Sequence, residues 1–262
     1  DIGNIMKKYC SFMQTYCPAA VVSGLPPEHG ERMRLMELHA KNTLDHHLKN
    51  KMDCNIFSFN GCPDEYVEHV TENFLKPNYK NVEVLRYDGT LPYTETFRQS
   101  LNWVKENGFT DFMFFQDDGF TVAPKPILDS VFDLYDSNNI TMLHLDNQDK
   151  QYLETCDKDK VLIGNGVKLY YSNTQRWVDK GLPHFGDSPY LANVDVLLNE
   201  LYLEGYFQAG TVHNGENWFS QRAWEKPMDR WQVDIHISGN INFIGPCSSD
   251  ANFLKEKLVK II

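Results

Sequence analysis

The chain has 262 residues, of which 42% are hydrophobic, and this suffices to bury a large core. Its net charge is −11 and no run of Lys and Arg stands out, so we expect no nucleic-acid partner. No apolar run approaches the roughly 18–20 residues that a membrane helix needs, and no secretory signal is present. These features predict a globular chain without a membrane span.

The ends and the cysteines bear on the cellular location. The first residue is Asp rather than Met, so we expect a trimmed chain or part of a longer polypeptide. Six cysteines are scattered without a CxxC spacing, which disfavours a structural zinc site and fits a reducing compartment. We therefore expect a cytoplasmic protein. The lumen of the Golgi or ER is the alternative if an anchor has been removed, because an even number of cysteines can pair.

The first fifty residues lack the rhythm of the rest of the chain. Residues 28–50 have apolar side chains at helical spacing, and the segment before them is rich in Pro and Gly. The pattern predicts an N-terminal helical extension over residues 1–50 and a catalytic domain over residues 51–262. Within that domain we expect a nucleotide-binding half at about 51–147 and an acceptor half at about 148–262.

A regular alternation begins at Asn55. Strand patterns cover residues 55–60, 81–89 and 111–115, and amphipathic helix patterns cover 64–76 and 94–108. This strand-helix alternation with short connections predicts an α/β fold with a mostly parallel, Rossmann-like sheet flanked by helices. Further along, the patterns predict a helix at 124–138, a strand at 140–147, an exposed loop at 148–160, a strand or hairpin at 160–173, a helix at 189–207 and a strand at 231–246.

Polar residues follow the predicted strands of the first half. Ser58 and Asn60 end the first strand, Asp88 ends the second, and Gln116, Asp117 and Asp118 end the third. Ligands of such sheets bind beyond the carboxyl ends of the strands. Two adjacent carboxylates after a buried strand favour a cation site, although a turn or a helix cap explains each of these residues equally simply. Neither a GxGxxG nor a P-loop motif is present, so a bound phosphate would need a cation.

The strand-helix order followed by "FFQDDGF" resembles the GT-A class of glycosyltransferases, whose Asp-x-Asp-type motif binds a metal and a nucleotide sugar. Here the motif reads Gln-Asp-Asp, and the resemblance covers roughly residues 54–245. It implies that Asp118 ligates Mn²⁺ or Mg²⁺ and that Asp117 faces the ribose or the sugar. The segment "TFRQSLNW" resembles the part of family 2 enzymes whose Arg lies near the donor, which implies a donor-binding role for Arg98.

The same resemblance implies roles for residues of the second half. Glu216 in "NGENW" resembles the acid that serves as the base near the acceptor, and Asp187 in "HFGDSPY" is the rival candidate. His236 resembles the late His that completes the metal shell. Asp234 would point to the same side as His236 in a regular strand and is a second candidate ligand.

These features predict a metal-dependent, inverting glycosyltransferase that moves a sugar from a UDP- or GDP-linked donor to a hydroxyl of a glycan or glycoconjugate. A sugar-phosphate nucleotidyltransferase is the first alternative. It needs a loop rich in Gly and Lys or Arg after the first strand, and "FNGCPDEY" is not such a loop, with a single Gly and no Lys or Arg. The second alternative is an inactive GT-like domain that only binds carbohydrate.

Overall fold

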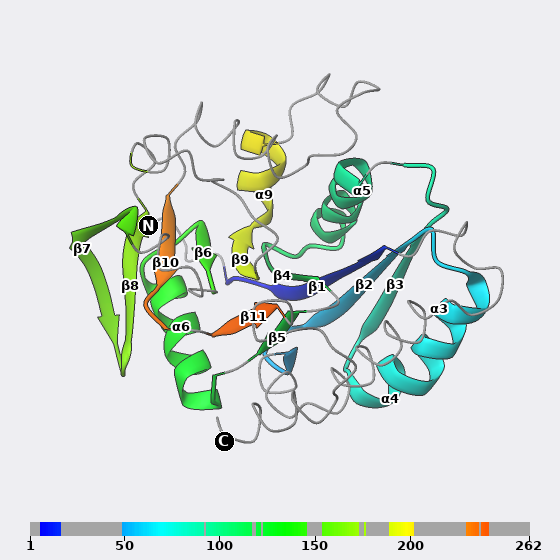
Figure 1. Cartoon of the computed structure of the whole chain (residues 1–262), viewed down its shortest axis with the longest axis horizontal. Coiled ribbons are helices and arrows are strands. Elements are labelled where there is room, and N and C mark those ends of the chain that lie inside the picture. The colour runs from blue at the N-terminus through cyan, green and yellow to red at the C-terminus, as the bar shows by residue number, and fades with distance from the viewer. Residues whose placement is uncertain are drawn as a thin grey trace.

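The computed structural model describes residues 6–16, 49–91, 93–116, 119–121, 123–145, 154–172, 176, 189–201, 229–235 and 237–240. Within these ranges the chain forms a nine-stranded sheet with helices on both faces, and a separate two-stranded sheet (Figure 1). None of the helices in these ranges is long and apolar enough to cross a lipid bilayer.

The strands are β1 Tyr9–Tyr16, β2 Cys54–Asn60, β3 Val82–Tyr87, β4 Asp111–Gln116, β5 Gly119–Thr121, β6 Met142–His144, β7 Cys156–Gly164, β8 Val167–Ser172, β9 Tyr190–Asn193, β10 Arg230–Val233 and β11 Ser238–Asn240. The helices are α3 Asp64–Val70, α4 Lys76–Asn78, α5 Tyr93–Glu106, α6 Lys125–Ser137 and α9 Val194–Val196, with π-helical turns η2 Thr71–Leu75 and η3 Leu197–Leu201.

The large sheet has the strand order β3-β2-β1-β4-β9-β6-β10-β8-β7. Strands β8 and β9 run opposite to the other seven, because each pairs antiparallel with both of its neighbours. The predicted α/β fold with a mostly parallel sheet flanked by helices is therefore confirmed. The alternation β2-α3-β3-α5-β4 also forms as predicted, as do helix α6 and the β7–β8 hairpin, whose bend at Asn165 and Gly166 has positive φ angles.

The N-terminal segment differs from the prediction. Residues 9–16, expected within a helical extension, form β1, which pairs in parallel with β2 on one side and β4 on the other. Its residues are buried on both faces, so the strand lacks the polar-apolar alternation that identifies a half-exposed strand. Of the helix predicted at 28–50, only the last two residues lie in the described ranges.

Three boundaries in the second half also differ. The helix predicted at 189–207 begins at Val194, because residues 190–193 form β9 between β4 and β6, and the Asn193 side chain then accepts the Val196 N–H at 3.1 Å as a helix cap. The predicted loop 148–160 ends early, since β7 starts at the buried Cys156.

The strand predicted at 231–246 is interrupted after Val233. The Asp234 carboxylate accepts the backbone N–H of Lys168 at 3.0 Å, and the Ile237 N–H donates to the Leu145 carbonyl at 3.0 Å. The chain then continues as β11, which pairs with β5. The expectation that Asp234 belongs to a regular strand beside residue 236 is therefore wrong.

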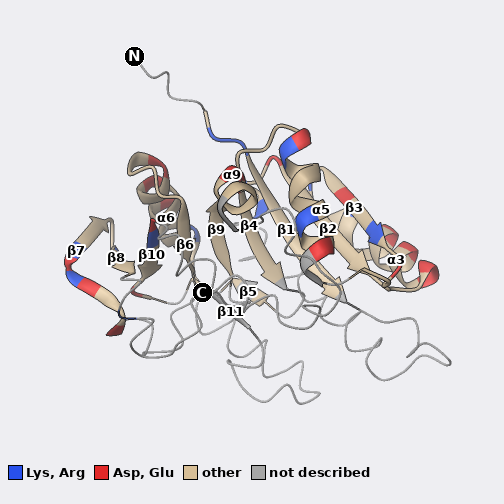
Figure 2. Cartoon of the chain, turned by 90° about the horizontal axis from the view of Figure 1, so that it is seen from above, with Lys and Arg blue, Asp and Glu red and all other residues tan. Residues whose placement is uncertain are grey.

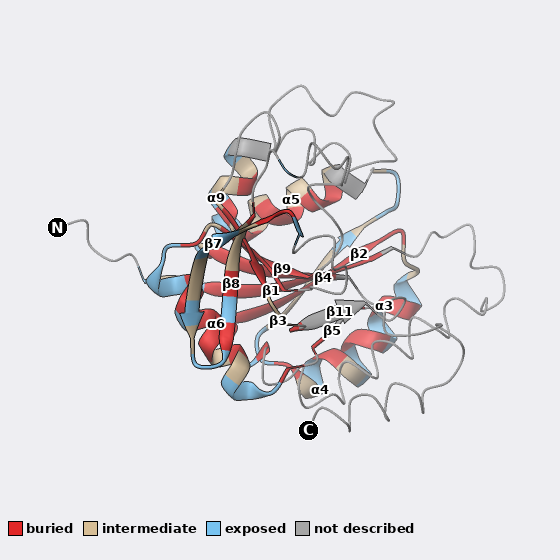
Figure 3. Cartoon of the chain, turned by 60° about the vertical axis from the view of Figure 1, so that its left-hand side comes forward, coloured by how far each residue is buried: buried red, intermediate tan, exposed pale blue. Residues whose placement is uncertain are grey.

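The core has two parts, one on each face of the sheet. Helices α3 and α6 cover one face with side chains such as Val70 and Val131, and α5 with α9 covers the other with side chains such as Leu101 and Val194 (Figure 3). Among the described residues, the charged ones lie mainly on the helices and on the two edge strands, β3 and β7 (Figure 2). Charges on edge strands discourage pairing with other chains.

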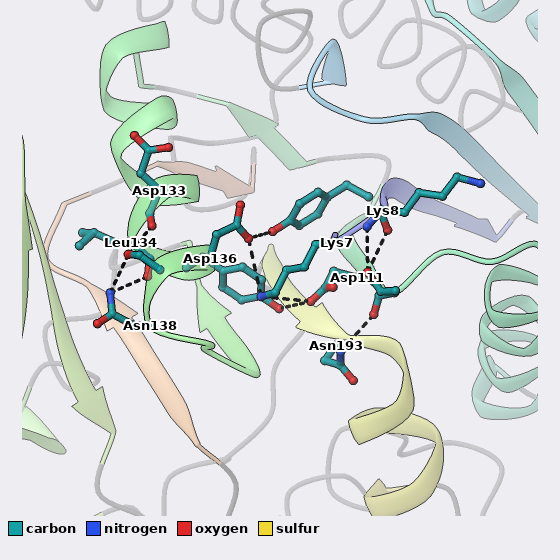
Figure 4. A network of polar contacts seen from close by, with 12 residues as sticks. Lys7, Lys8, Asp111, Asp133, Leu134, Asp136, Asn138 and Asn193 are labelled. Carbon is teal, nitrogen blue, oxygen red and sulfur yellow. Dashed lines mark hydrogen bonds and ion pairs between the residues drawn. The ribbon is translucent and has the colours of Figure 1, made fainter. Parts of the chain in front are cut away.

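A buried polar cluster fixes the start of β1 (Figure 4). Asp111, the first residue of β4, is fully buried, and the Tyr135 hydroxyl of α6 donates to it at 2.8 Å. The Lys7 ammonium lies 3.7 Å from the carboxylates of both Asp111 and Asp136 and 3.9 Å from the centre of the Tyr135 ring. Tyr9 donates to Asp136. The cluster therefore joins β1, β4 and α6 at the amino ends of the strands.

Burial dominates the chemistry of this cluster. It raises the pKa of the Asp111 carboxyl above its ordinary value, although Lys7 and the Tyr135 hydroxyl act in the opposite direction. Asp111 and Tyr135 are buried, whereas the Lys7 and Asp136 side chains are 21% and 47% exposed, so solvent screens part of the attraction between these charges. Because the cluster lies at the amino ends of the strands, its role is to hold β1 in place.

A second buried pair joins β6 to β10. Arg230 is fully buried and donates to the His144 imidazole. Burial and the nearby guanidinium hold the pKa of His144 well below its ordinary value of 6.5. The folded protein therefore keeps His144 neutral at pH values where the unfolded chain binds a proton.

This difference predicts a pH-dependent stability. As the pH falls below about 6.5, His144 binds a proton in the unfolded chain but not in the folded protein. This difference lowers the free energy of unfolding by up to about 1.4 kcal/mol per pH unit. His144→Gln retains an acceptor for Arg230 but does not titrate. Urea unfolding between about pH 7.5 and pH 5.5 should show the variant gaining stability relative to the parent as the pH falls. Parallel curves would show that His144 is protonated in the fold.

Candidate functional site

The carboxyl ends of β1 to β4 meet at one edge of the sheet, because these four strands are parallel neighbours. Gln14 of β1 lies beside Ser58 of β2 and Gln116 of β4, and Asn60 lies beside Tyr87 of β3. The structure thus brings together the ends of the three strands that the sequence identified, and adds the end of β1, which the sequence did not identify.

Polar side chains replace the apolar core where α5 meets this edge. Further from the edge, Phe12, Phe112 and Phe114 pack against the helix. At the edge, the Gln14 Nε2–H donates to the Thr96 hydroxyl at 3.1 Å, and the Tyr87 and Ser100 hydroxyls lie 3.0 Å apart.

Ser58 belongs to this layer and lies 3.5 Å from the Ser100 hydroxyl. Ser58 is buried between the sheet and α5, where its contact with Ser100 joins the strand to the helix.

Three buried oxygen atoms at this edge have no hydrogen-bond partner among the described residues: Gln14 Oε1, Thr15 Oγ1 and Asn60 Oδ1. Each side chain is at most 5% exposed. A buried polar atom without a partner costs about 1–3 kcal/mol, and most such atoms in folded proteins are satisfied. Gln14 and Asn60 lie on the face of the sheet that α5 covers, whereas Thr15 alternates with Gln14 and lies on the other face. The unpartnered oxygens of Gln14 and Asn60 on adjacent strands therefore indicate a candidate place for a ligand that donates hydrogen bonds.

The loops after β2 and β3 touch at this edge. The Gly61 N–H donates to the Tyr87 carbonyl at 2.8 Å, and both Gly61 and Gly89 have positive φ angles. A Cβ atom at Gly89 would lie 2.9 Å from the Gly61 Cα. Only glycine fits here, and the contact fixes how Asn60 and Tyr87 end their strands.

Asp88 has a local role in the same loop. Its carboxylate accepts hydrogen bonds from the Thr90 hydroxyl at 2.5 Å and the Thr90 N–H at 2.9 Å, and these bonds lower the pKa of Asp88. The side chain is exposed to solvent. The turn alternative considered for Asp88 describes this geometry.

Arg98 lies away from the strand ends. It forms an ion pair with Glu95, with Nε donating to Oε2 at 2.9 Å, and this pair lowers the pKa of Glu95. Arg98 also lines a hollow of about 510 Å³ between α5 and η3, together with Lys105 and Asn199. Its donor-binding role stays a prediction.

The other predicted residues are outside the described ranges: Asp117, Asp118, Asp187, Glu216 and His236, and for Gln116 only the backbone is described. Their roles stay predictions. Strand β5, which starts directly after Asp118, pairs antiparallel with β11, which starts two residues after His236. In that register Gly119 faces Asn240, while Ser238 faces Thr121. Among the described residues, no group of three or more His, Cys, Asp or Glu side chains is placed to hold a metal.

Sequence reasoning missed Gln14, Thr15 and Thr96. Gln14 and Thr15 follow an apolar run in "YCSFMQTY", and the same pattern identified the ends of the other strands. The pattern did not lead to a strand prediction here because residues 1–50 were expected to form a helical extension. Thr96 had no local signal, since its partner lies 82 positions away.

The sequence matches no protein family model and no curated protein. The fold is similar to solved structures at low identity. One is a CMP:2-keto-3-deoxy-manno-octonic acid synthetase complexed with CTP, with a TM-score of 0.49, 13% identity, and coverage of 97% of this chain and 98% of that chain. Another is the inositol-1-phosphate CTP transferase of T. maritima, with a TM-score of 0.48, 12% identity, and coverage of 97% and 96%.

A third is a proposed nucleotide-diphospho-sugar transferase of Desulfovibrio desulfuricans G20, with a TM-score of 0.47, 9% identity, and coverage of 98% of this chain and 97% of that chain. At these identities and scores, the likenesses carry no inference about the chemistry of this chain.

The glycine contact at the site generates a prediction. Gly89→Ala should lower the free energy of unfolding by about 1 kcal/mol for the positive φ and by a further ~1–3 kcal/mol for the clash with Gly61. Gly108→Ala is the matched control, because Gly108 also has a positive φ but nothing within 4 Å of the added Cβ. Denaturant unfolding of both variants measures the difference. Equal losses would contradict the close packing of the two loops.

Proposed function

We propose that the chain is a transferase acting on nucleotide-linked sugars, and specifically a metal-dependent glycosyltransferase. One observation carries the proposal: the unpartnered oxygens of Gln14 and Asn60 on one face of the sheet at the carboxyl ends of β1 and β2. Parallel α/β sheets bind ligands at this edge, and a nucleoside carries the hydroxyl and N–H donors that these oxygens lack. Asn60 then binds the nucleoside, as the sequence predicted, together with Gln14.

The charges at the edge favour a cation for the diphosphate. Two arginines of the first half, Arg86 and Arg98, each pair with a carboxylate, Asp64 and Glu95 respectively. We assign Asp118 as the ligand of Mn²⁺ or Mg²⁺, with His236 completing the shell. This assignment rests on the resemblance of "FFQDDGF" to the GT-A motif, because in the antiparallel β5–β11 register Gly119 faces Asn240 rather than Ser238. When bound, the cation would supply positive charge to the leaving diphosphate.

In the proposed reaction, the bond between the anomeric carbon and the diphosphate oxygen breaks while the acceptor oxygen bonds to that carbon from the opposite side. The acceptor is a glycan or glycoconjugate hydroxyl, and its proton passes to Glu216, with Asp187 as the alternative base. Asp117 and Gln116 bind the ribose or the sugar. The anomeric carbon becomes oxocarbenium-like on the way, as in glycoside hydrolysis.

One observation favours nucleotidyl transfer as a second candidate. The first strand is β1, so the segment that follows the first strand in the sequence is residues 17–48 rather than the residues after Asn60. That segment contains Gly24, Gly30, Arg32 and Arg34 in "SGLPPEHGERMR", the residue types that cradle a triphosphate. The reason for setting a nucleotidyltransferase aside therefore no longer holds.

Product analysis separates the two reactions. The protein is incubated with Mn²⁺ and either a nucleotide sugar plus a glycan acceptor, or a nucleoside triphosphate plus a sugar phosphate, and phosphorus NMR follows the products. Glycosyl transfer releases a nucleoside diphosphate, whereas nucleotidyl transfer releases pyrophosphate and forms a nucleotide sugar. We expect the first, and we expect it to stop in chelator. Pyrophosphate release would establish the second candidate, and binding without any product would indicate an inactive binding domain.

Two variants should separate donor binding from catalysis. Asp118→Asn should abolish metal-dependent binding of the nucleotide sugar and transfer together. Glu216→Gln should leave donor affinity unchanged and slow transfer by about 10²–10⁴-fold, the usual contribution of a general base. Calorimetric affinity and transfer rate are measured on the same preparations. A rate within a few fold of the parent would move the role to Asp187, and turnover of Asp118→Asn at the parent rate would refute the metal site.

A further inference from the structure

The Gln14 side chain is held at one end only. Its Nε2–H donates to the hydroxyl of Thr96, which lies fully buried on α5, while its Oε1 has no partner among the described residues. A carboxamide donates hydrogen bonds from its nitrogen and accepts them at its oxygen. Binding of the nitrogen by Thr96 therefore leaves an acceptor for any ligand.

Asn60 presents a second acceptor on the same face of the sheet. Ser58 lies beside Gln14 in the register, and side chains two positions apart in a strand point to the same face, so Gln14 and Asn60 share it. Asn60 Oδ1 is also without a partner in the described part of the chain. Two unpartnered acceptors on adjacent strands call for a ligand that donates hydrogen bonds.

We propose that Thr96 determines specificity: it holds the Gln14 amide with the carbonyl oxygen toward the nucleoside, so that the site selects nucleosides by the hydrogen bonds that they donate. This rests on the proposed function. The donors come from one of two sources, the ring N–H of uracil or guanine, or the ribose hydroxyls. Thr96 acts through Gln14 and is a positioning residue.

The test compares nucleotides that differ by one donor. The probes are UDP and GDP, the same nucleotides methylated at the ring N–H, and their 2′-deoxy and 3′-deoxy forms, each with Mn²⁺. Calorimetry gives affinities for the parent protein, Thr96→Val and Thr96→Ser. Val has the shape of Thr without the hydroxyl, and Ser keeps the hydroxyl.

We expect the parent protein to bind UDP or GDP roughly ten-fold more tightly than the methylated or the deoxy form, since one hydrogen bond is worth about that much. The analogue that loses affinity identifies the source of the donor. Thr96→Ser should keep this ten-fold ratio of the two affinities. Thr96→Val should bring the ratio close to one, because the Gln14 amide, no longer bound to Thr96, can turn its nitrogen toward the ligand.

An unchanged ratio in Thr96→Val overturns the inference and leaves the proposed function intact, as does equal binding of all analogues by the parent protein. If no nucleotide binds the parent protein with or without Mn²⁺, the proposed function fails and the inference fails with it. Should Thr96→Val not fold, Gln14→Met serves instead, since it removes the acceptor at similar length. Gln14→Met should also bind the nucleotide and its analogue with equal affinity. A preference for the nucleotide in this variant would overturn the role of Gln14.

Discussion

The insertion of β1 between β2 and β4 is the constraint on which the rest of the structure depends. Its two neighbours come from residues 54–60 and 111–116, so the centre of the sheet forms only when distant parts of the chain meet. The buried cluster of Lys7, Asp111 and Tyr135 fixes its start. A one-residue slip of β1 would turn each of its side chains to the other face of the sheet. By fixing the register of β1, the cluster therefore also determines which side chains lie at the carboxyl end of the strand.

At that far end the fold carries a cost that packing does not explain. Gln14 and Asn60 bury oxygen atoms without partners in the described part of the chain, whereas Phe12 and Ile56, earlier on the same face of these strands, are apolar. Proteins retain such costs at functional sites, where a ligand repays them. In our proposal, the two strand ends, the polar layer on α5 and the glycine contact between Gly61 and Gly89 together form the edge that binds a hydrogen-bonding ligand.

Local patterns in the sequence predicted much of this fold. The alternation from β2 to β4 was correct because each helix there has an apolar stripe and each strand ends in a turn residue. β1, with eight residues, was missed because it is buried on both faces, which leaves no period to detect, and β9 was missed because it has only four residues. Asn60 was found from its place at a strand end. Gln14 and Thr96 required the structure, because the contact that makes them informative joins residues 82 positions apart.

The central claim is that a nucleoside fills the unpartnered acceptors at the ends of β1 and β2. A crystal structure with bound UDP or GDP and Mn²⁺ tests it most directly. The account predicts electron density for the nucleoside at this edge, with donor groups within hydrogen-bond distance of Gln14 Oε1 and Asn60 Oδ1. A nucleotide bound elsewhere, for example in the hollow between α5 and η3, with these two oxygens still unpartnered, would contradict it.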